Sequence, residues 1–129
     1  MPHARRLEEN KRIVLAFYQA AINDKDHAAA SKLLSDGYVQ HNPRIADGLE
    51  GFREFVETLK EDFPHLRAEV KRIFAEGDHV MAHVHGVRVP GGPGTAIVDI
   101  FRLEEGRISE HWDVMQQIPD EARNQNGMF

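Results

Sequence analysis

The sequence contains no cysteine in its 129 residues. This absence excludes disulfide bonds, thiolate nucleophiles and metal sites built on cysteine ligands. It is compatible with a cytoplasmic location, which we expect for this protein. No apolar segment approaches 18 residues, so we predict no transmembrane helix. The first twelve residues, MPHARRLEENKR, contain no apolar run, and we expect no secretory signal peptide there.

A block of positive charge is also missing. The formal net charge is −5, and the 16 basic residues are interspersed with 21 acidic ones. Nucleic-acid surfaces need clustered Lys and Arg, so we expect neither a nucleic-acid nor a membrane partner. The chain has no P-loop, no GxGxxG and no Ser-His-Asp motif. Nucleotide binding, dinucleotide binding and triad hydrolysis therefore have no support in the sequence.

The composition that is present is typical of one globular domain. Hydrophobic residues make up 41% and charged residues 29% of the chain. A chain of this length buries roughly two-thirds of its unfolded surface, which is enough for a sizeable core. We predict a single domain over residues 1–129, with a core spanning about residues 7–119 and a polar C-terminal tail over residues 120–129.

The first half of the chain has helical periodicity. Apolar residues recur every three to four positions, with charged residues between them. Asp26 is placed to cap the second helix, Gly37 to end it in a left-handed conformation, and Pro64 to stop the third. The predicted helices are Ala4–Asn23, His27–Leu34 and Leu49–Phe63.

The second half alternates with a period of two, which is typical of β-strands. Pro- and Gly-containing turns separate the alternating segments. Helices followed by hairpin-connected strands indicate an α+β fold, with a curved antiparallel sheet packed on three N-terminal helices and a cavity between them. The predicted strands are a short extended piece at Tyr38–Pro43 and then Arg67–Ala75, His79–Val89, Thr95–Leu103 and Ile108–Gln117.

The turn before the last strand decides which polar residues share a face. We predict a three-residue turn over 104–106, with Gly106 left-handed in a bulge. This register places Asp99 opposite His111 and Ile97 opposite Asp113. A two-residue turn would instead place Asp99 beside the single tryptophan. In the predicted register one face holds Ile97, Asp99, Phe101, His111, Asp113 and Met115, and the other holds Val98, Ile100, Trp112 and Val114.

Two carboxylates and a histidine among apolar side chains suit general acid–base chemistry. A carboxylate can remove a proton next to a carbonyl, while a His or Tyr donates a hydrogen bond to the developing oxyanion. Tyr38 and His41 are expected to reach the same cavity from its mouth. The alternatives are an ordinary core aromatic for Tyr38 and a solvated loop residue for His41. The candidate catalytic residues are Asp113, His41, His111 and Asp99, and the candidate substrate-binding residues are Phe17, Tyr38, Phe55, Leu59, His83, His85, Phe101 and Met115.

His83 and His85 share one face of a strand, a spacing that occurs in metal sites. They could bind a metal together with Asp99 or Asp113. The spacing is short and the chain has no cysteine, so we expect no metal and no cofactor. We interpret the two histidines as polar pocket lining, with the polar face of an interface as the alternative.

Several segments together resemble a known family. The chain is similar to the SnoaL-like polyketide cyclases of the NTF2-like superfamily, especially the predicted SnoaL-like aldol-condensation enzymes, over roughly Asn10–Pro119. The resemblance implies a conical α+β barrel with an internal pocket for a small molecule. It also implies a homodimer formed through the outer sheet face, and chemistry without metal or cofactor. The segments that carry it are Tyr38–Pro43, Val98–Arg102, Gly106–Ile108 and Glu110–Val114.

The resemblance also implies residue roles. In the cyclases an Asp on the last strand is the general acid/base of an intramolecular aldol closure, and this role falls on Asp113. A His from the early loop assists, and His41 is the matching position. The preceding strand supplies a His in the cyclases, where this chain has Asp99.

Three functions follow as hypotheses. The first is a cofactor-independent cyclase- or isomerase-type enzyme acting on a small hydrophobic substrate. The second is a small-molecule-binding module without catalysis, because one fold hosts many functions. The third is addition of water, as in epoxide hydrolysis, with the water held by Asp99, Asp113 and Asn42.

Overall fold

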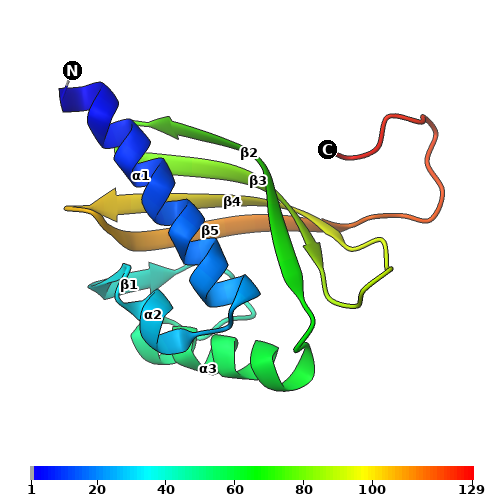
Figure 1. Ribbon diagram of the computed structural model, residues 1–129, viewed down its shortest axis with the longest axis horizontal. Helices are drawn as coiled ribbons and strands as arrows, with labels where there is room; N and C mark the ends of the chain where they lie inside the picture. The colour runs from blue at the N-terminus through cyan, green and yellow to red at the C-terminus, as the bar shows by residue number, and fades with distance from the viewer. Residues whose placement is uncertain (1) are drawn as a thin grey trace.

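The computed structural model describes residues 2–129, and it confirms the α+β class (Figure 1). Helices come first and a five-stranded sheet follows, with one strand between the second and third helices. Within the described residues, no helix has the length and apolar character needed to cross a membrane. The elements are α1 (Pro2–Tyr18), the π-helical turn η1 (Gln19–Asn23), α2 (His27–Ser31), β1 (Leu34–Gln40), α3 (Gly48–Asp62), β2 (Arg67–Glu76), β3 (His79–Val87), β4 (Thr95–Glu104) and β5 (Arg107–Gln117).

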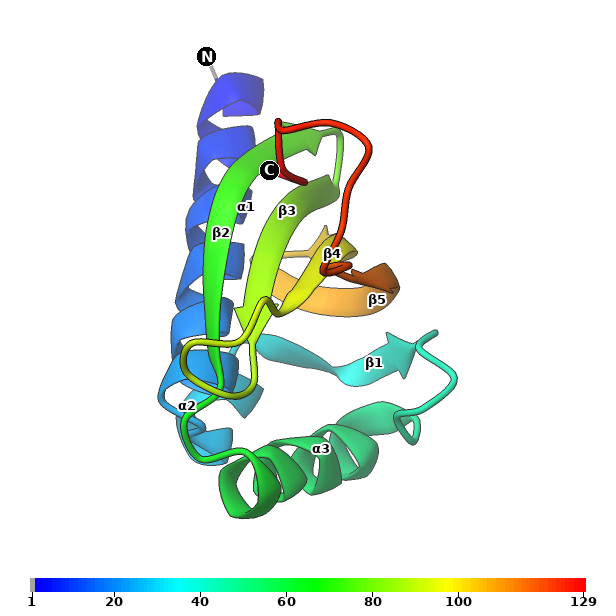
Figure 2. The same cartoon turned by 90° about the vertical axis from the view of Figure 1, so that its right-hand side faces the viewer.

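The sheet is curved and does not close into a barrel (Figure 2). Its strand order is β1-β5-β4-β3-β2, and β2 to β5 pair antiparallel as predicted. The edge strand β1 departs from the expected antiparallel arrangement, because it pairs parallel with β5. Parallel pairing is possible here since α3 and three strands intervene between the two.

The helices cover the concave face of the sheet. In Figure 1, α1 crosses the sheet diagonally, and Figure 2 shows α3 beyond the edge strand β1. Apolar side chains from α1, α3 and the inner sheet face meet in one cluster. Burying such side chains is the main stabilising contribution to a domain of this size. The fully or almost fully buried members include Val14, Phe17, Phe52, Val56, Val80, Ala82, Val84, Phe101 and Leu103.

The second helix begins as predicted and ends earlier. The side chain of Asp26 accepts a hydrogen bond of 3.1 Å from the backbone N–H of Ala29, which is the expected N-cap. The helix stops at Ser31, and Gly37 lies inside β1 without a positive φ, so the prediction for this end was wrong. Competition from the sheet explains the difference, because the N–H of Ile108 in β5 donates to the carbonyl of Leu33 at 2.8 Å.

The start of α3 is tied to the end of β1. Asp47 caps the helix, and its Oδ1 accepts from the N–H of Gly48 at 2.9 Å and from that of Gln40 at 2.8 Å. Gly51 in the first turn lies against the carbonyl of Ala46, where an added Cβ would come within 1.8 Å of the oxygen. These contacts fix the loop over residues 41–47, which carries part of the site.

The β4–β5 hairpin has a different turn from the predicted one. Glu104 pairs with Arg107, so the turn has two residues, and both Glu105 (φ 49°) and Gly106 (φ 78°) are left-handed, as a type I′ turn requires. The three-residue prediction was therefore wrong.

A bulge at Ser109 then restores the predicted faces. Leu103 pairs with Ile108 but Arg102 pairs with Glu110, so β5 has one extra residue at this point. Asp99 consequently lies opposite Asp113 rather than opposite His111. The two-residue turn shifts the pairing of β5 with β4 by one position, and the extra residue at Ser109 shifts it by one more. The side chains of Asp99, His111 and Asp113 therefore still project from the concave face.

Candidate functional site

A cavity of about 150 Å³ lies between the concave face of the sheet, α1 and α3. Its walls are mainly apolar, and polar side chains gather at one end. Pockets of this kind, apolar with a few convergent polar groups, are the usual ligand sites of proteins. Of the eight side chains predicted to bind substrate, six line the cavity: Phe17, Tyr38, Phe55, Leu59, Phe101 and Met115.

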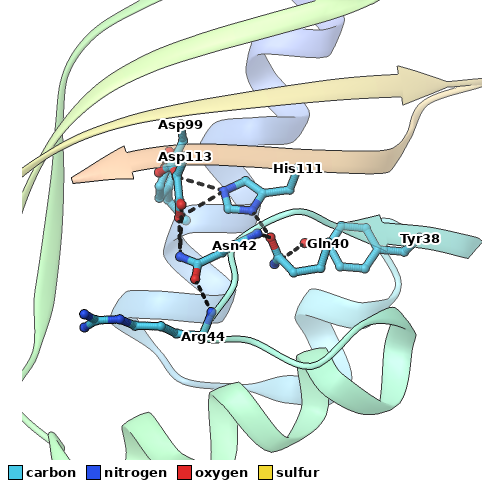
Figure 3. Close-up of polar contacts among 8 residues, drawn as sticks. Tyr38, Gln40, Asn42, Arg44, Asp99, His111 and Asp113 are labelled. Carbon is cyan, nitrogen blue, oxygen red and sulfur yellow. Dashed lines mark hydrogen bonds and ion pairs between the residues drawn. The ribbon is translucent and has the colours of Figure 1, made fainter.

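Asp99, His111 and Asp113 meet at the polar end of the cavity (Figure 3). Nε2 of His111 lies 2.8 Å from Oδ1 of Asp99 and 3.8 Å from Oδ2 of Asp113. Their side chains are only 10%, 10% and 6% exposed, in the order His111, Asp99 and Asp113. The structure thus brings together three of the four candidate catalytic residues.

Tyr18 supports this cluster from α1 and was missed by the sequence analysis. Its hydroxyl donates to Oδ2 of Asp99. Burial, and after it the negative charge of Asp99, raises the pKa of Tyr18 well above its usual value. The tyrosine therefore stays protonated and donates to the carboxylate. The available signal was its place beside Phe17 on a buried face of the first helix.

Gln40 determines how His111 is protonated. The side-chain oxygen of Gln40 accepts from the backbone N–H of Asn42 at 2.9 Å, and its Nε2 donates to the hydroxyl of Tyr38 at 3.0 Å. A backbone N–H can only donate, which assigns the orientation of the amide. Nδ1 of His111, 2.7 Å from the same oxygen, must therefore donate. Its Nε2 lies 2.8 Å from Oδ1 of Asp99, so the ring is held between Gln40 and Asp99.

Asn42 holds the carboxylate of Asp113. Its Nδ2 lies 2.9 Å from each carboxylate oxygen (Figure 3). Its Oδ1 accepts from the backbone N–H of Arg44 at 2.8 Å, which assigns the amide orientation. A carboxylate has about four acceptor positions, so Asp113 keeps acceptor capacity for a ligand.

Tyr38 offers a hydrogen to the cavity. Its hydroxyl oxygen accepts from Gln40, and within residues 2–129 no group accepts the hydroxyl hydrogen. Burial, followed by the negative charges of Asp99 and Asp113, raises the pKa of Tyr38. The hydroxyl therefore remains a donor, and the Tyr38 residue lines the same cavity as Asp113.

His41 does not reach the cavity, contrary to the prediction. Its Nε2 lies 2.6 Å from Oε2 of Glu110, and its ring stacks on Trp112 with the ring centroids 4.9 Å apart. The hydrogen bond from His41, followed by that from Arg102, lowers the pKa of Glu110. Alternation along an extended chain explains the placement. Tyr38 and Gln40 are two residues apart, so both side chains face inward, whereas the side chain of His41 faces outward.

His83 and His85 also lie outside the cavity. The inward residues of β3 are Val80, Ala82 and Val84, each fully buried, so the odd-numbered histidines project from the outer face. There their rings lie 5.1 and 4.6 Å, centroid to centroid, from that of Phe129. The interpretation of the two histidines as pocket lining was therefore wrong, and their position also separates them from Asp99 and Asp113, the partners of the metal site that we did not favour. The alternative, the polar face of an interface, stays a prediction.

One group of potential metal ligands occurs among the described residues. Ligand atoms of Asp99, His111 and Asp113 all lie within 4.8 Å of one another. Nε2 of His111 lies 2.8 Å from Oδ1 of Asp99 and Nδ1 lies 2.7 Å from Oε1 of Gln40, which are hydrogen-bond distances. We therefore interpret the group as a hydrogen-bonded cluster.

Comparison with known proteins identifies a family match. The model of a family described as SnoaL-like polyketide cyclase matches residues 12–122. A comparison with curated proteins gives no match.

Solved structures with the same fold cover most of the chain. TsrD from Streptomyces laurentii is 25% identical, with a TM-score of 0.69, over 84% of this chain and 88% of its own. AclR from Streptomyces galilaeus, provisionally named a hydroxylase, is 24% identical with a TM-score of 0.72, over 91% of both chains. An NTF2-like protein from Cytophaga hutchinsonii is 23% identical with a TM-score of 0.69, over 83% of this chain and 89% of its own.

Proposed function

The chain belongs to the SnoaL-like polyketide cyclase family, and from this premise we propose that it is a cofactor-independent enzyme of cyclase or isomerase type. It removes a proton next to a carbonyl group of a small hydrophobic substrate. One observation carries the proposal: Asp113 and Tyr38, whose hydroxyl hydrogen has no acceptor among the described residues, line the same mainly apolar cavity. A base and an oxyanion donor in one cavity are what enolate formation requires.

The first step is proton transfer to Asp113. The substrate C–H bond breaks, its proton passes to a carboxylate oxygen, and the electron pair moves to the carbonyl oxygen. Tyr38 donates its hydroxyl hydrogen to that oxygen and stabilises the enolate. In an aldol closure the enolate carbon then bonds to a second carbonyl carbon of the same molecule, the π electron pair of that carbonyl moves to its oxygen, and this alkoxide takes the proton from Asp113. In an isomerisation the enolate instead takes the proton back from Asp113 at another carbon.

The neighbouring residues position the base. Asn42 fixes the orientation of the Asp113 carboxylate through its amide. The ring of His111 lies between the two carboxylates, 2.8 Å from Asp99 and 3.8 Å from Asp113. Asp99 and Gln40 hold this ring in place, and Tyr18 holds Asp99.

The test is deuterium exchange at the carbon next to a carbonyl. The acetyl protons of 4-methylacetophenone are followed by proton NMR in D₂O with the wild type, Asp113→Asn and Asp120→Asn. Asp120 is an exposed residue of the tail and serves as the matched control. We expect Asp113→Asn to lower the enzymatic exchange rate about 10²- to 10⁴-fold with an unchanged thermal unfolding midpoint. Equal exchange by Asp113→Asn would remove Asp113 from this role, and saturable binding without exchange by the wild type would favour a binding module.

The contact between Asn42 and Asp113 also favours a second candidate, the opening of an epoxide by water. Asp113 would take a proton from a water molecule held beside Asn42. The water oxygen would bond to an epoxide carbon as its C–O bond breaks, and Tyr38 would protonate the alkoxide. Formation of a diol from styrene oxide, with the oxygen of ¹⁸O-labelled water incorporated, distinguishes this reaction from proton exchange.

A further inference from the structure

Charged side chains occur only at the two ends of the cavity. Asp99, His111 and Asp113 form the polar end, and Arg88 is the one other charged residue of the lining. The wall between them is made of apolar side chains together with the hydroxyl of Thr95. The polar end thus has two carboxyl groups and one histidine, while the opposite end has the guanidinium group of Arg88.

Arg88 lies at the rim, far from the acids. It follows Gly86, which pairs with Thr95 at the start of β4. Thr95 is four residues before Asp99, so the rim is roughly 13 Å along the strand from the polar end at 3.3 Å per residue. The exposed Arg88 also lines the cavity, and its guanidinium carbon lies 4.8 Å from the ring centroid of Phe63, which limits where the group can go.

The charge of Arg88 has no ion-pair partner among the described residues. Within residues 2–129, no carboxylate lies within ion-pair distance of its guanidinium, whereas the other rim and wall residues are neutral. Guanidinium groups bind carboxylates through paired N–H donors. An anion entering the cavity mouth would therefore meet a cation that has no ion-pair partner among the described residues.

The volume limits the size of the ligand. An apolar cavity of about 150 Å³ in another protein holds one benzene molecule, and the present cavity has the same volume. One ring therefore fits between the acids and the rim. A fused system of three or four rings would project through the mouth into water.

From these observations we propose that the substrate is a one-ring carbonyl compound that carries an anionic group, such as a carboxylate, at the end opposite the reacting carbon. This inference rests on the proposed function for the identity of the reacting end. Arg88 binds the anion at the rim, the ring fills the apolar section, and the carbonyl end reaches Asp113 and Tyr38. The reversed orientation would place the anion against Asp99 and Asp113, where like charges repel.

Binding of a matched pair of ketones tests the role of Arg88 independently of turnover. The probes are 4-acetylbenzoate and 4-methylacetophenone, which differ only by a carboxylate in place of a methyl group. Titration calorimetry at low ionic strength compares the wild type, Arg88→Gln and Arg107→Gln, since Arg107 is an exposed arginine outside the cavity lining. We expect the wild type to bind 4-acetylbenzoate about tenfold more tightly, as one charge-assisted contact provides.

The variants decide whether the preference comes from Arg88. We expect Arg88→Gln to lose the preference and to bind the neutral ketone as the wild type does, while Arg107→Gln keeps the preference. Equal affinities in the wild type, or a preference that persists in Arg88→Gln, would overturn the assignment. Failure of both ketones to bind at millimolar concentration would overturn the one-ring limit, as would tighter binding of the two-ring 6-acetyl-2-naphthoate.

Exchange of the acetyl protons, measured in the same samples, separates this inference from the proposed function. A carboxylate preference that depends on Arg88, without exchange, leaves the anion site standing and contradicts the enzymatic proposal. Proton exchange that depends on Asp113, without a preference for the ketone that carries a carboxylate, supports the proposed enzymatic function and overturns the anion site at Arg88.

Discussion

Asn42 donates its side-chain amide to both carboxylate oxygens of Asp113, at 2.9 Å each, although 71 residues separate them in the chain. The parallel pairing of β1 with β5 makes this contact possible, because Gln40 at the end of β1 lies beside His111. The loop that follows the edge strand thus supplies the residue that orients the base. The same pairing explains why Gln40 reaches Nδ1 of His111.

Replacing Asn42 by leucine tests this orientation. The substitution keeps the approximate size of the side chain and removes both the donor to Asp113 and the acceptor for Arg44 N–H. We expect a loss of about 1–3 kcal/mol in the free energy of unfolding, because Asp113 is left without its amide partner. We also expect proton exchange to fall about 10²-fold, since the carboxylate loses its alignment.

Urea unfolding and NMR exchange measure the two effects separately. Gln125→Leu, in the exposed tail, is the control for adding a leucine, and it should change neither quantity. Destabilisation with an unchanged exchange rate would mean that Asn42 acts on the fold alone.

The sequence predicted the faces of the strands better than the details of their connections. Alternation was enough to place Asp99, His111 and Asp113 on one face, and the structure confirms this grouping. The turn and the bulge were harder, because the left-handed conformation of Glu105 and the extra residue at Ser109 leave no distinct pattern in the residues themselves. Their two effects on register compensate, so the faces were right although the pairing was wrong.

The error at His41 was avoidable on the same principle. Tyr38 and His41 are three residues apart in an extended segment, so their side chains cannot both face the cavity. Alternation pointed instead to Gln40 and Asn42. Tyr18 left one signal in the sequence, its place beside Phe17 in the first helix, but its contact with Asp99 depends on how the helix packs on the sheet. Arg88 left no such signal, because it reaches the cavity from a loop through tertiary packing.

Adding one methyl group at Gly51 should disturb both the fold and the site. Its Cβ would come within 1.8 Å of the carbonyl oxygen of Ala46, so the loop over residues 41–47 must move. We expect Gly51→Ala to lower the free energy of unfolding by about 1–3 kcal/mol and to reduce proton exchange, because this loop carries Asn42. Gly37→Ala is the control, since nothing lies within 4 Å of an added Cβ there. A stable and fully active Gly51→Ala would contradict the rigidity of this loop.

We propose that the outer sheet face joins two copies of the chain. Phe74, Met81, Ile100 and Trp112 pair across four neighbouring strands, and Phe74 and Met81 are 57% and 45% exposed. An exposed apolar row of this kind marks an interaction surface. Sedimentation should show a dimer that Met81→Glu converts to monomers and that Leu15→Glu, on α1, leaves intact. A monomeric wild type at micromolar concentration would contradict the prediction.

The two tyrosines should make the protein sensitive to alkali. Both are buried, and the pKa of each is raised from 10.0, so above pH 10 the unfolded chain loses two protons that the folded chain keeps. Stability is therefore unaffected by these groups below pH 10 and falls as the pH rises toward their folded pKa values, by about 1.4 kcal/mol per pH unit for each tyrosine.

Tyr38→Phe should remove half of this tyrosine-dependent slope, as measured by urea unfolding from pH 9 to about pH 11. Tyrosinate absorbance should show no ionisation of either residue before unfolding. Ionisation of one tyrosine near pH 10 in the folded protein would contradict its burial and its role as a donor.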